Sequence, residues 1–171
     1  MGSSRGKSSL SVFCLAVAVA LLAAVPVALA VEGEGEPITR SEYIQRVEPI
    51  CAGSSKSNST ILKGVKTQVK QGKLVPAGKR FIRASGVLDK STTRIAQVPQ
   101  PQADSAKLTK WIGYLKSEGS FLQRIGKSLK SGNKYKAQKL AVKLNTNNNK
   151  ANNTVISFGF KECRIDSSRF I

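Results

Sequence analysis

The chain has 171 residues and carries 28 Lys and Arg against 10 Asp and Glu, which gives a formal net charge of +18 at neutral pH. It contains no histidine, and this excludes a Ser–His–Asp triad, the usual general base and most zinc or haem ligation. No Walker loop, G-x-S-x-G motif or dinucleotide fingerprint is present, so the sequence predicts a protein that is not an enzyme and binds no cofactor and no metal. An enzyme that uses Lys, Ser or carboxylate groups stays open as an alternative.

The first thirty residues have the three parts of a secretory signal peptide. Arg5 and Lys7 form a basic start, an apolar run follows over residues 12–31, and Ala28-Leu29-Ala30 supplies small residues at the cleavage site. We expect cleavage after Ala30, which removes residues 1–30. The remaining chain carries 26 Lys and Arg against 10 Asp and Glu, a net charge of about +16. The mature protein is then secreted or associated with the cell envelope. An uncleaved membrane anchor is the alternative, since about 20 apolar residues can span a bilayer.

Residues 31–38 are predicted to form a flexible acidic leader, and residues 39–171 a single helical domain. The domain opens with a capping box, because Thr39 is followed by Glu42 three residues later. Apolar and small polar residues then recur at spacings of three and four, which predicts one helix that ends near Gly72. Pro49 lies inside this pattern and is expected to kink the helix or to split it in two.

Three more helices are predicted downstream, each with one apolar face. The second runs from about residue 77 to 96, after Leu74-Val75-Pro76 breaks the pattern. The third runs from about 103 to 130, and the fourth from 134 to about 158. Because short turns join these helices, the expected fold is all-α, an antiparallel four-helix bundle.

Glycine and cysteine positions refine this fold. Gly119 and Gly126 lie on the apolar face of the third predicted helix, which predicts a close approach to a neighbouring helix. Removal of the signal peptide also removes Cys14 and leaves Cys51 and Cys163, and an even count in an exported domain favours a disulfide. This bridge would tie the C-terminal tail onto the first helix. A redox-active or metal-binding thiol pair is the alternative, although the chain has no C-x-x-C motif.

Basic side chains recur at spacings of seven or three on three of the predicted helices, and residues so spaced lie on one helical side. Such rows form either a solvated surface or a face that binds polyanions. The polyanions considered are anionic cell-wall polymers, anionic lipids and, without sequence specificity, nucleic acid. The nine candidate residues are Lys56, Lys63 and Lys70 in the first helix, Arg124, Lys127 and Lys130 in the third, and Lys136, Lys143 and Lys150 in the fourth.

Two aromatic residues of the third predicted helix raise a second function. Trp111 and Tyr114 are candidates for lining a pocket, which would make the protein an extracytoplasmic small-ligand-binding or sensor module. The other interpretation places both residues in the core or at its edge.

Three segments of the chain together resemble a known group of proteins. They are ITRSEYIQRVEPIC after the signal, PQPQADSAKLTKWIGYL at the start of the third helix, and FGFKEC near the end. The chain resembles secreted helical proteins of high-GC Gram-positive bacteria, in which an EYI…IC segment and a terminal GF..C segment bracket a helical domain. The resemblance implies an exported, disulfide-tied helical bundle, and it implies no activity.

Overall fold

The structure is a computed structural model that describes residues 38–166. The predicted signal peptide and nearly all of the predicted leader lie outside these residues. The described part of the chain is all-helical and contains no strand, which confirms the predicted fold class. Its elements are α1 (Arg40–Leu62), α2 (Val65–Lys70), α3 (Leu74–Ala96), the short 3-10 helix η1 (Gln102–Asp104), α4 (Ser105–Lys130), α5 (Lys134–Thr154) and the 3-10 helix η2 (Ile156–Phe158).

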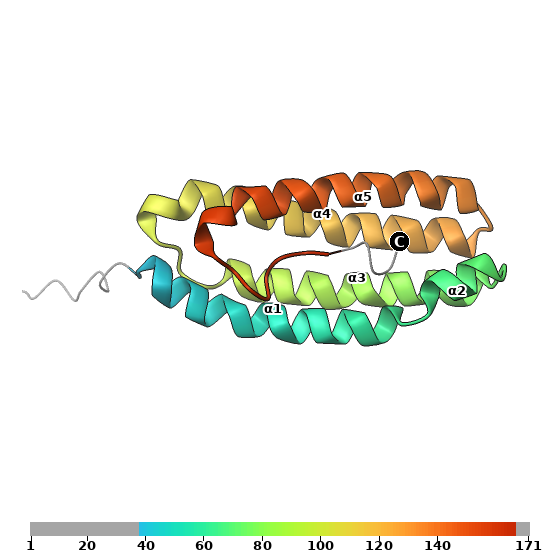
Figure 1. Cartoon of the computed structure of the whole chain (residues 1–171), viewed down its shortest axis with the longest axis horizontal. Helices are drawn as coiled ribbons and strands as arrows, with labels where there is room; N and C mark the ends of the chain where they lie inside the picture. Colours follow the sequence, from blue (N-terminus) through green and yellow to red (C-terminus); the bar gives the residue numbers. More distant parts are fainter. Residues whose placement is uncertain (1–37, 167–171) are drawn as a thin grey trace, which may run out of the picture. The chain divides into compact units, whose positions relative to one another are not determined.

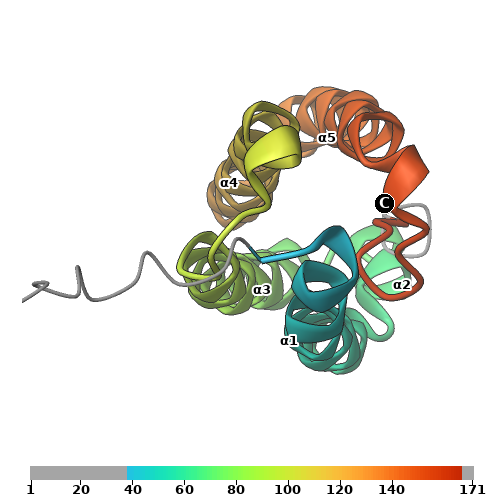
Figure 2. The same cartoon turned by 90° about the vertical axis from the view of Figure 1, so that its left-hand side faces the viewer.

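The four long helices form a bundle (Figure 1). Helix α3 packs against both α1 and α4, and α4 packs against α5. Seen along the helices, α1, α3, α4 and α5 follow one another around a shared interior, and the chain after η2 runs between α5 and α1 (Figure 2). The C-terminal segment therefore closes the bundle on the side where α1 and α5 would otherwise meet.

Helix α1 begins as predicted and ends earlier than predicted. The capping box is present: the backbone N–H of Glu42 donates to Thr39 Oγ1 over 3.2 Å, and the backbone N–H of Thr39 donates to Glu42 Oε2 over 2.8 Å. Pro49 lies within α1 and does not split it. The expected single helix is instead interrupted at Gly64, whose φ of 77° is a left-handed conformation that glycine adopts without steric penalty. Helix α2 starts directly after this glycine.

Helix α3 begins at Leu74, about three residues before its predicted start, and so includes Pro76 in its first turn. The prediction that this proline breaks the helical pattern was wrong. A proline is tolerated there, because the first N–H groups of a helix have no partner within the helix. The chain reaches this start through Gly72, which also has a positive φ of 76°.

Helices α3 and α4 approach closely at glycines, as predicted for Gly119 and Gly126. A Cβ atom placed on Gly126 would lie 2.6 Å from the backbone carbonyl oxygen of Gly78, whereas one on Gly119 would meet the end of the Asp89 side chain. The first contact is with backbone, so glycine at position 126 is what allows the two helices to pack closely there, while at position 119 the Asp89 side chain could move aside.

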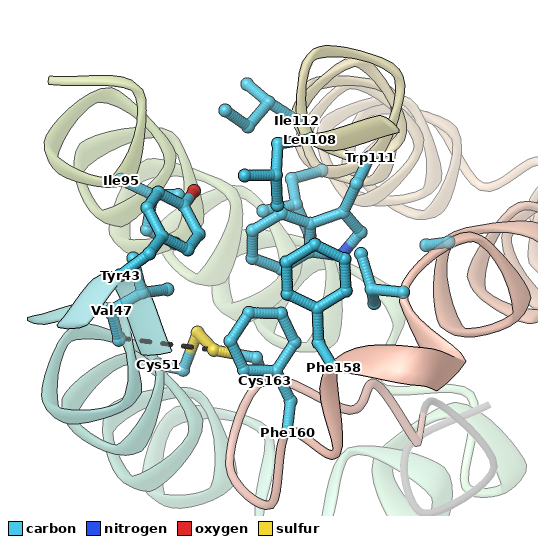
Figure 3. Close-up of a cluster of buried hydrophobic side chains, with 13 residues drawn as sticks. Tyr43, Val47, Cys51, Ile95, Leu108, Trp111, Ile112, Phe158, Phe160 and Cys163 are labelled. Carbon is cyan, nitrogen blue, oxygen red and sulfur yellow. Dashed lines mark hydrogen bonds between the residues drawn. A yellow bond between two sulfur atoms is a disulfide. The ribbon is translucent and has the colours of Figure 1, made fainter. Parts of the chain in front are cut away.

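Two apolar clusters fill the interior, and the first contains the two cysteines (Figure 3). The sulfur atoms of Cys51 and Cys163 lie 2.04 Å apart, which is disulfide distance, so the predicted link between the tail and α1 is present. Phe160 stacks on Trp111 with ring centroids 5.3 Å apart and on Phe158 with centroids 5.4 Å apart. The tail thus contributes aromatic side chains as well as a cysteine to this cluster.

The second apolar cluster lies among the end of α1, α2, α3 as far as Leu88, the second half of α4 and the first half of α5. Its members share full or nearly full burial and come from all of these helices; they include Val65, Phe81, Leu122, Ile125, Leu129, Ala137 and Leu140. This cluster joins the parts of the chain that carry most of the predicted basic rows.

Candidate functional site

All nine lysines and arginines of the predicted basic rows are exposed. Lys136, Lys143 and Lys150 lie on the continuous helix α5, and the Arg124 row lies near the end of α4, as expected. The row that begins at Lys56 is not a single helical row, because the break at Gly64 separates its members. Lys56 is in α1, the next lysine caps that helix and the third is in α2.

Basic residues concentrate in two segments, 63–83 and 121–143, which we call the basic end of the bundle. Each segment contains seven Lys and Arg and no Asp or Glu. The two segments lie together, since both contribute to the second apolar cluster and since Gly78 and Gly126 are in contact. Fourteen basic residues therefore lie on adjoining surfaces without any acidic residue among them. Such a surface attracts polyanions.

An open groove of about 520 Å³ lies within the basic end. Its lining includes Phe81, Ile125 and Ala137, and lysines from two helices also line it: Lys66, Lys70 and Lys134. The groove therefore combines an apolar surface with ammonium groups.

Two large hydrophobic side chains of α5 are exposed to solvent. Tyr135 is 67% exposed and Val142 is 69% exposed, and their spacing of seven places them on one side of the helix. The ammonium group of Lys139 lies 4.5 Å from the centre of the Tyr135 ring, which is a cation–π contact. This face of α5 thus presents apolar and cationic groups together.

Several carboxyl groups outside the basic end are occupied by structural contacts. Asp104 accepts two hydrogen bonds of 2.7 Å from the guanidinium of Arg40, and these bonds lower the pKa of the Asp104 carboxyl. Glu48 accepts from the backbone N–H groups of Lys161 and Glu162, over 2.5 and 2.8 Å, and so fixes the tail against α1. These carboxylates stabilise the other part of the bundle and leave the basic end unneutralised.

The aromatic pair of α4 lies in and against the core. Trp111 is fully buried in the first apolar cluster, and Tyr114 is half-buried and packs against that cluster. Neither residue lines the groove or the internal cavity of the bundle. Trp111 is therefore a core residue, which agrees with the second of the two interpretations.

A cavity of about 110 Å³ that is partly open to solvent lies next to the two cysteines, between α1, α3, α4 and the C-terminal segment, and we call it the internal cavity. One of its lining residues is Glu118, a buried carboxyl that we did not identify as a site residue from the sequence. A signal was present, because Glu118 follows Leu115 by three residues and precedes Leu122 by four, which places it on the apolar face of α4.

No protein-family model, no curated protein and no solved structure matches this chain. The resemblance to secreted helical proteins of Gram-positive bacteria therefore stays a prediction. Within residues 38–166, no helix is long and apolar enough to cross a membrane. The same residues contain no group of three or more Cys, Asp or Glu side chains that is suited to holding a metal ion.

Proposed function

We propose that this protein is an exported, non-enzymatic helical bundle that binds anionic polymers or lipids of the cell envelope through its basic end. The observation that supports this function is the segregation of charge: two adjoining segments hold fourteen Lys and Arg and no carboxylate. A surface of one sign of charge raises the local concentration of polymers of the opposite sign. The exposed Tyr135 and Val142 add apolar contact area to this cationic surface.

The proposal includes the export and assembly of the chain. The signal peptide is cleaved after Ala30, the four long helices are antiparallel, and Cys51 and Cys163 form their bond outside the cytoplasm. Disulfides persist in oxidising compartments, so the disulfide distance between the two sulfur atoms supports this location.

The first experiment measures binding of the purified protein to three polyanions across a salt series. The probes are vesicles that contain phosphatidylglycerol, purified teichoic acid and duplex DNA, and a compact protein of equal net charge is the control. We expect one envelope polyanion to bind more tightly to this protein than to the control, with an affinity that falls as salt rises.

Two results would count against this function. Binding equal to that of the control on all three probes would show that the charge serves only as a solvated surface. A preference for duplex DNA over both envelope polyanions would point to nucleic acid as the partner instead.

A further inference from the structure

The cavity is partly open to solvent, and the C-terminal segment forms one of its walls. The C-terminal segment from Glu162 to Asp166 lines it on one side, and this segment is held at several points. Cys163 is at disulfide distance from Cys51, and Asn152 exchanges two hydrogen bonds with the backbone of Ile165, over 2.8 and 2.9 Å. Exposed residues of α1, such as Ser55 and Ser59, also line the cavity, so it extends toward the surface beside α1.

Glu118 is the feature of this cavity that no structural role explains. Its side chain is only 8% exposed, and Oε2 has no hydrogen-bond partner among the described residues. A buried carboxyl group without a partner is destabilising, and burial raises the pKa of Glu118 to about 8. Leucine at this position would extend the apolar face of α4 without that penalty. A ligand that pairs with the carboxyl group would account for its presence.

Further hydrogen-bond acceptors line the same cavity. Asn58 Oδ1 is buried and has no partner among the described residues. The Ser91 hydroxyl donates to the carbonyl of Leu88 and lies 3.1 Å from the Ser54 hydroxyl, so the Ser54 oxygen retains capacity to accept. Carboxyl, amide and hydroxyl oxygens from α1, α3 and α4 therefore line one small space.

The lining of the cavity is richer in carboxyl groups than the rest of the molecule. Three of the seven described carboxyl residues line it, namely Glu118, Glu162 and Asp166, together with one basic residue, Arg164. Over residues 38–166, by contrast, the chain carries 25 Lys and Arg against these seven. This local excess of carboxyl groups favours the cavity over the rest of the surface as a place for a cation, most strongly at pH values where Glu118 is ionised.

We propose that the internal cavity binds a small organic ammonium ion, with its charged head on Glu118 and its hydrocarbon part against leucines of α3 and α4. A primary ammonium group has three N–H donors and no acceptor, and Glu118, Asn58 and Ser54 provide three acceptors for it. Leu88, Leu115 and Leu122 supply the apolar lining. At about 110 Å³ the cavity is smaller than the cavity of roughly 150 Å³ that accommodates benzene in another protein, so it suits an amine with a short alkyl chain.

The test titrates the purified, oxidised protein with a series of alkylammonium ions, from ethylammonium to hexylammonium, and with the alcohols of equal chain length. Binding is followed by changes in the amide NMR spectrum at about pH 8, near the pKa of Glu118. We expect the best ammonium ion to bind about tenfold more tightly than its matched alcohol, or better, because only the ammonium forms charge-assisted hydrogen bonds with the carboxylate.

Two variants distinguish pairing with Glu118 from general attraction of cations. Glu118→Gln should abolish the preference for ammonium over alcohol. Glu162→Gln removes one exposed carboxyl group from the lining and should keep that preference, with a small loss of affinity. Equal binding of ammonium and alcohol to the wild type, or an unchanged preference in Glu118→Gln, would overturn the proposal. The absence of saturable binding by every ammonium ion in the series would overturn it as well.

Discussion

Replacing Glu118 with Gln measures how strongly burial of this carboxyl group affects folding. Glutamine has nearly the same shape and does not ionise in the accessible pH range. Burial raises the pKa of Glu118 from its ordinary value of 4.5 to about 8. Between these two pH values the folded protein holds a proton that the unfolded chain has released. The free energy of unfolding therefore falls as the pH rises through this window, and it becomes level above about pH 8.

The size of the effect follows from the pKa shift. One pKa unit corresponds to about 1.4 kcal/mol, so the penalty reaches about 5 kcal/mol at pH values above 8 and is about 1 kcal/mol at pH 5. The free energy of unfolding of the whole domain is expected to be only about 5–15 kcal/mol, so the penalty from this one carboxyl group is a large fraction of the total. We expect Glu118→Gln to become progressively more stable than the wild type as the pH increases.

Urea unfolding, followed by far-UV circular dichroism at pH 5, 7 and 9 with the disulfide intact, measures this difference. Glu118→Leu is the matched second variant, because it removes the same titration and differs from glutamine in shape. Both variants should show the same pH dependence relative to the wild type. If the difference between the wild type and Glu118→Gln stays constant from pH 5 to 9, the carboxyl group is not buried in the way we describe.

Three further perturbations test the packing, the covalent link and the ion pair of the bundle. Gly126→Ala should destabilise the protein by about 1–3 kcal/mol, because its Cβ would lie 2.6 Å from the Gly78 carbonyl oxygen. Gly113→Ala, whose Cβ meets nothing within 4 Å, should stabilise it by about 0.5–1 kcal/mol; equal effects of the two in thermal unfolding would contradict the close approach. Replacing both Cys51 and Cys163 with alanine should lower the free energy of unfolding by about 4–5 kcal/mol, since the bond closes a loop with a sequence separation of 112 residues; two free thiols detected by alkylation and intact-mass measurement in the exported protein would refute the link. Asp104→Asn should lower stability at neutral pH and not at low pH, because Arg40 lowers the pKa of Asp104 below its ordinary value of 3.8, and the contribution of the pair is lost as the pH falls through that lowered pKa. If urea unfolding shows the same loss of stability at neutral pH and at a pH below that pKa, this interpretation is refuted.

Helix positions and most buried faces could be predicted from the sequence, because apolar spacing reports directly which side of a helix is buried. The break at Gly64 could not. The apolar spacing continues from Ile61 to Val65 across this glycine, so the periodicity gives no sign that the helix stops. Only the positive φ of Gly64 reveals the break. Pro76 was misjudged for a related reason, since a proline in a first turn and a proline between helices look alike in sequence.

Most of the candidate sites could not be predicted from residue spacing, because they depend on how distant parts of the chain pack together. The basic residues were predictable one helix at a time, but their concentration at one end required knowing that segments 63–83 and 121–143 pack together. The cavity around Glu118 was beyond sequence reasoning, because residues more than one hundred positions apart in the chain, from Cys51 to Asp166, line it. The disulfide distance between Cys51 and Cys163 followed from counting cysteines, without any knowledge of packing.

The central claim is that the basic end, and not net charge alone, binds an envelope polyanion. Two triple variants separate these causes, because each changes three exposed lysines to glutamate and lowers the formal net charge by the same six units. One changes Lys79, Lys136 and Lys143 within the basic end, and the other changes Lys90, Lys110 and Lys116 outside it. Binding to the preferred envelope polyanion at moderate salt should be lost in the first variant and largely retained in the second. An equal loss in both variants would contradict the claim, because it would show that only total charge matters.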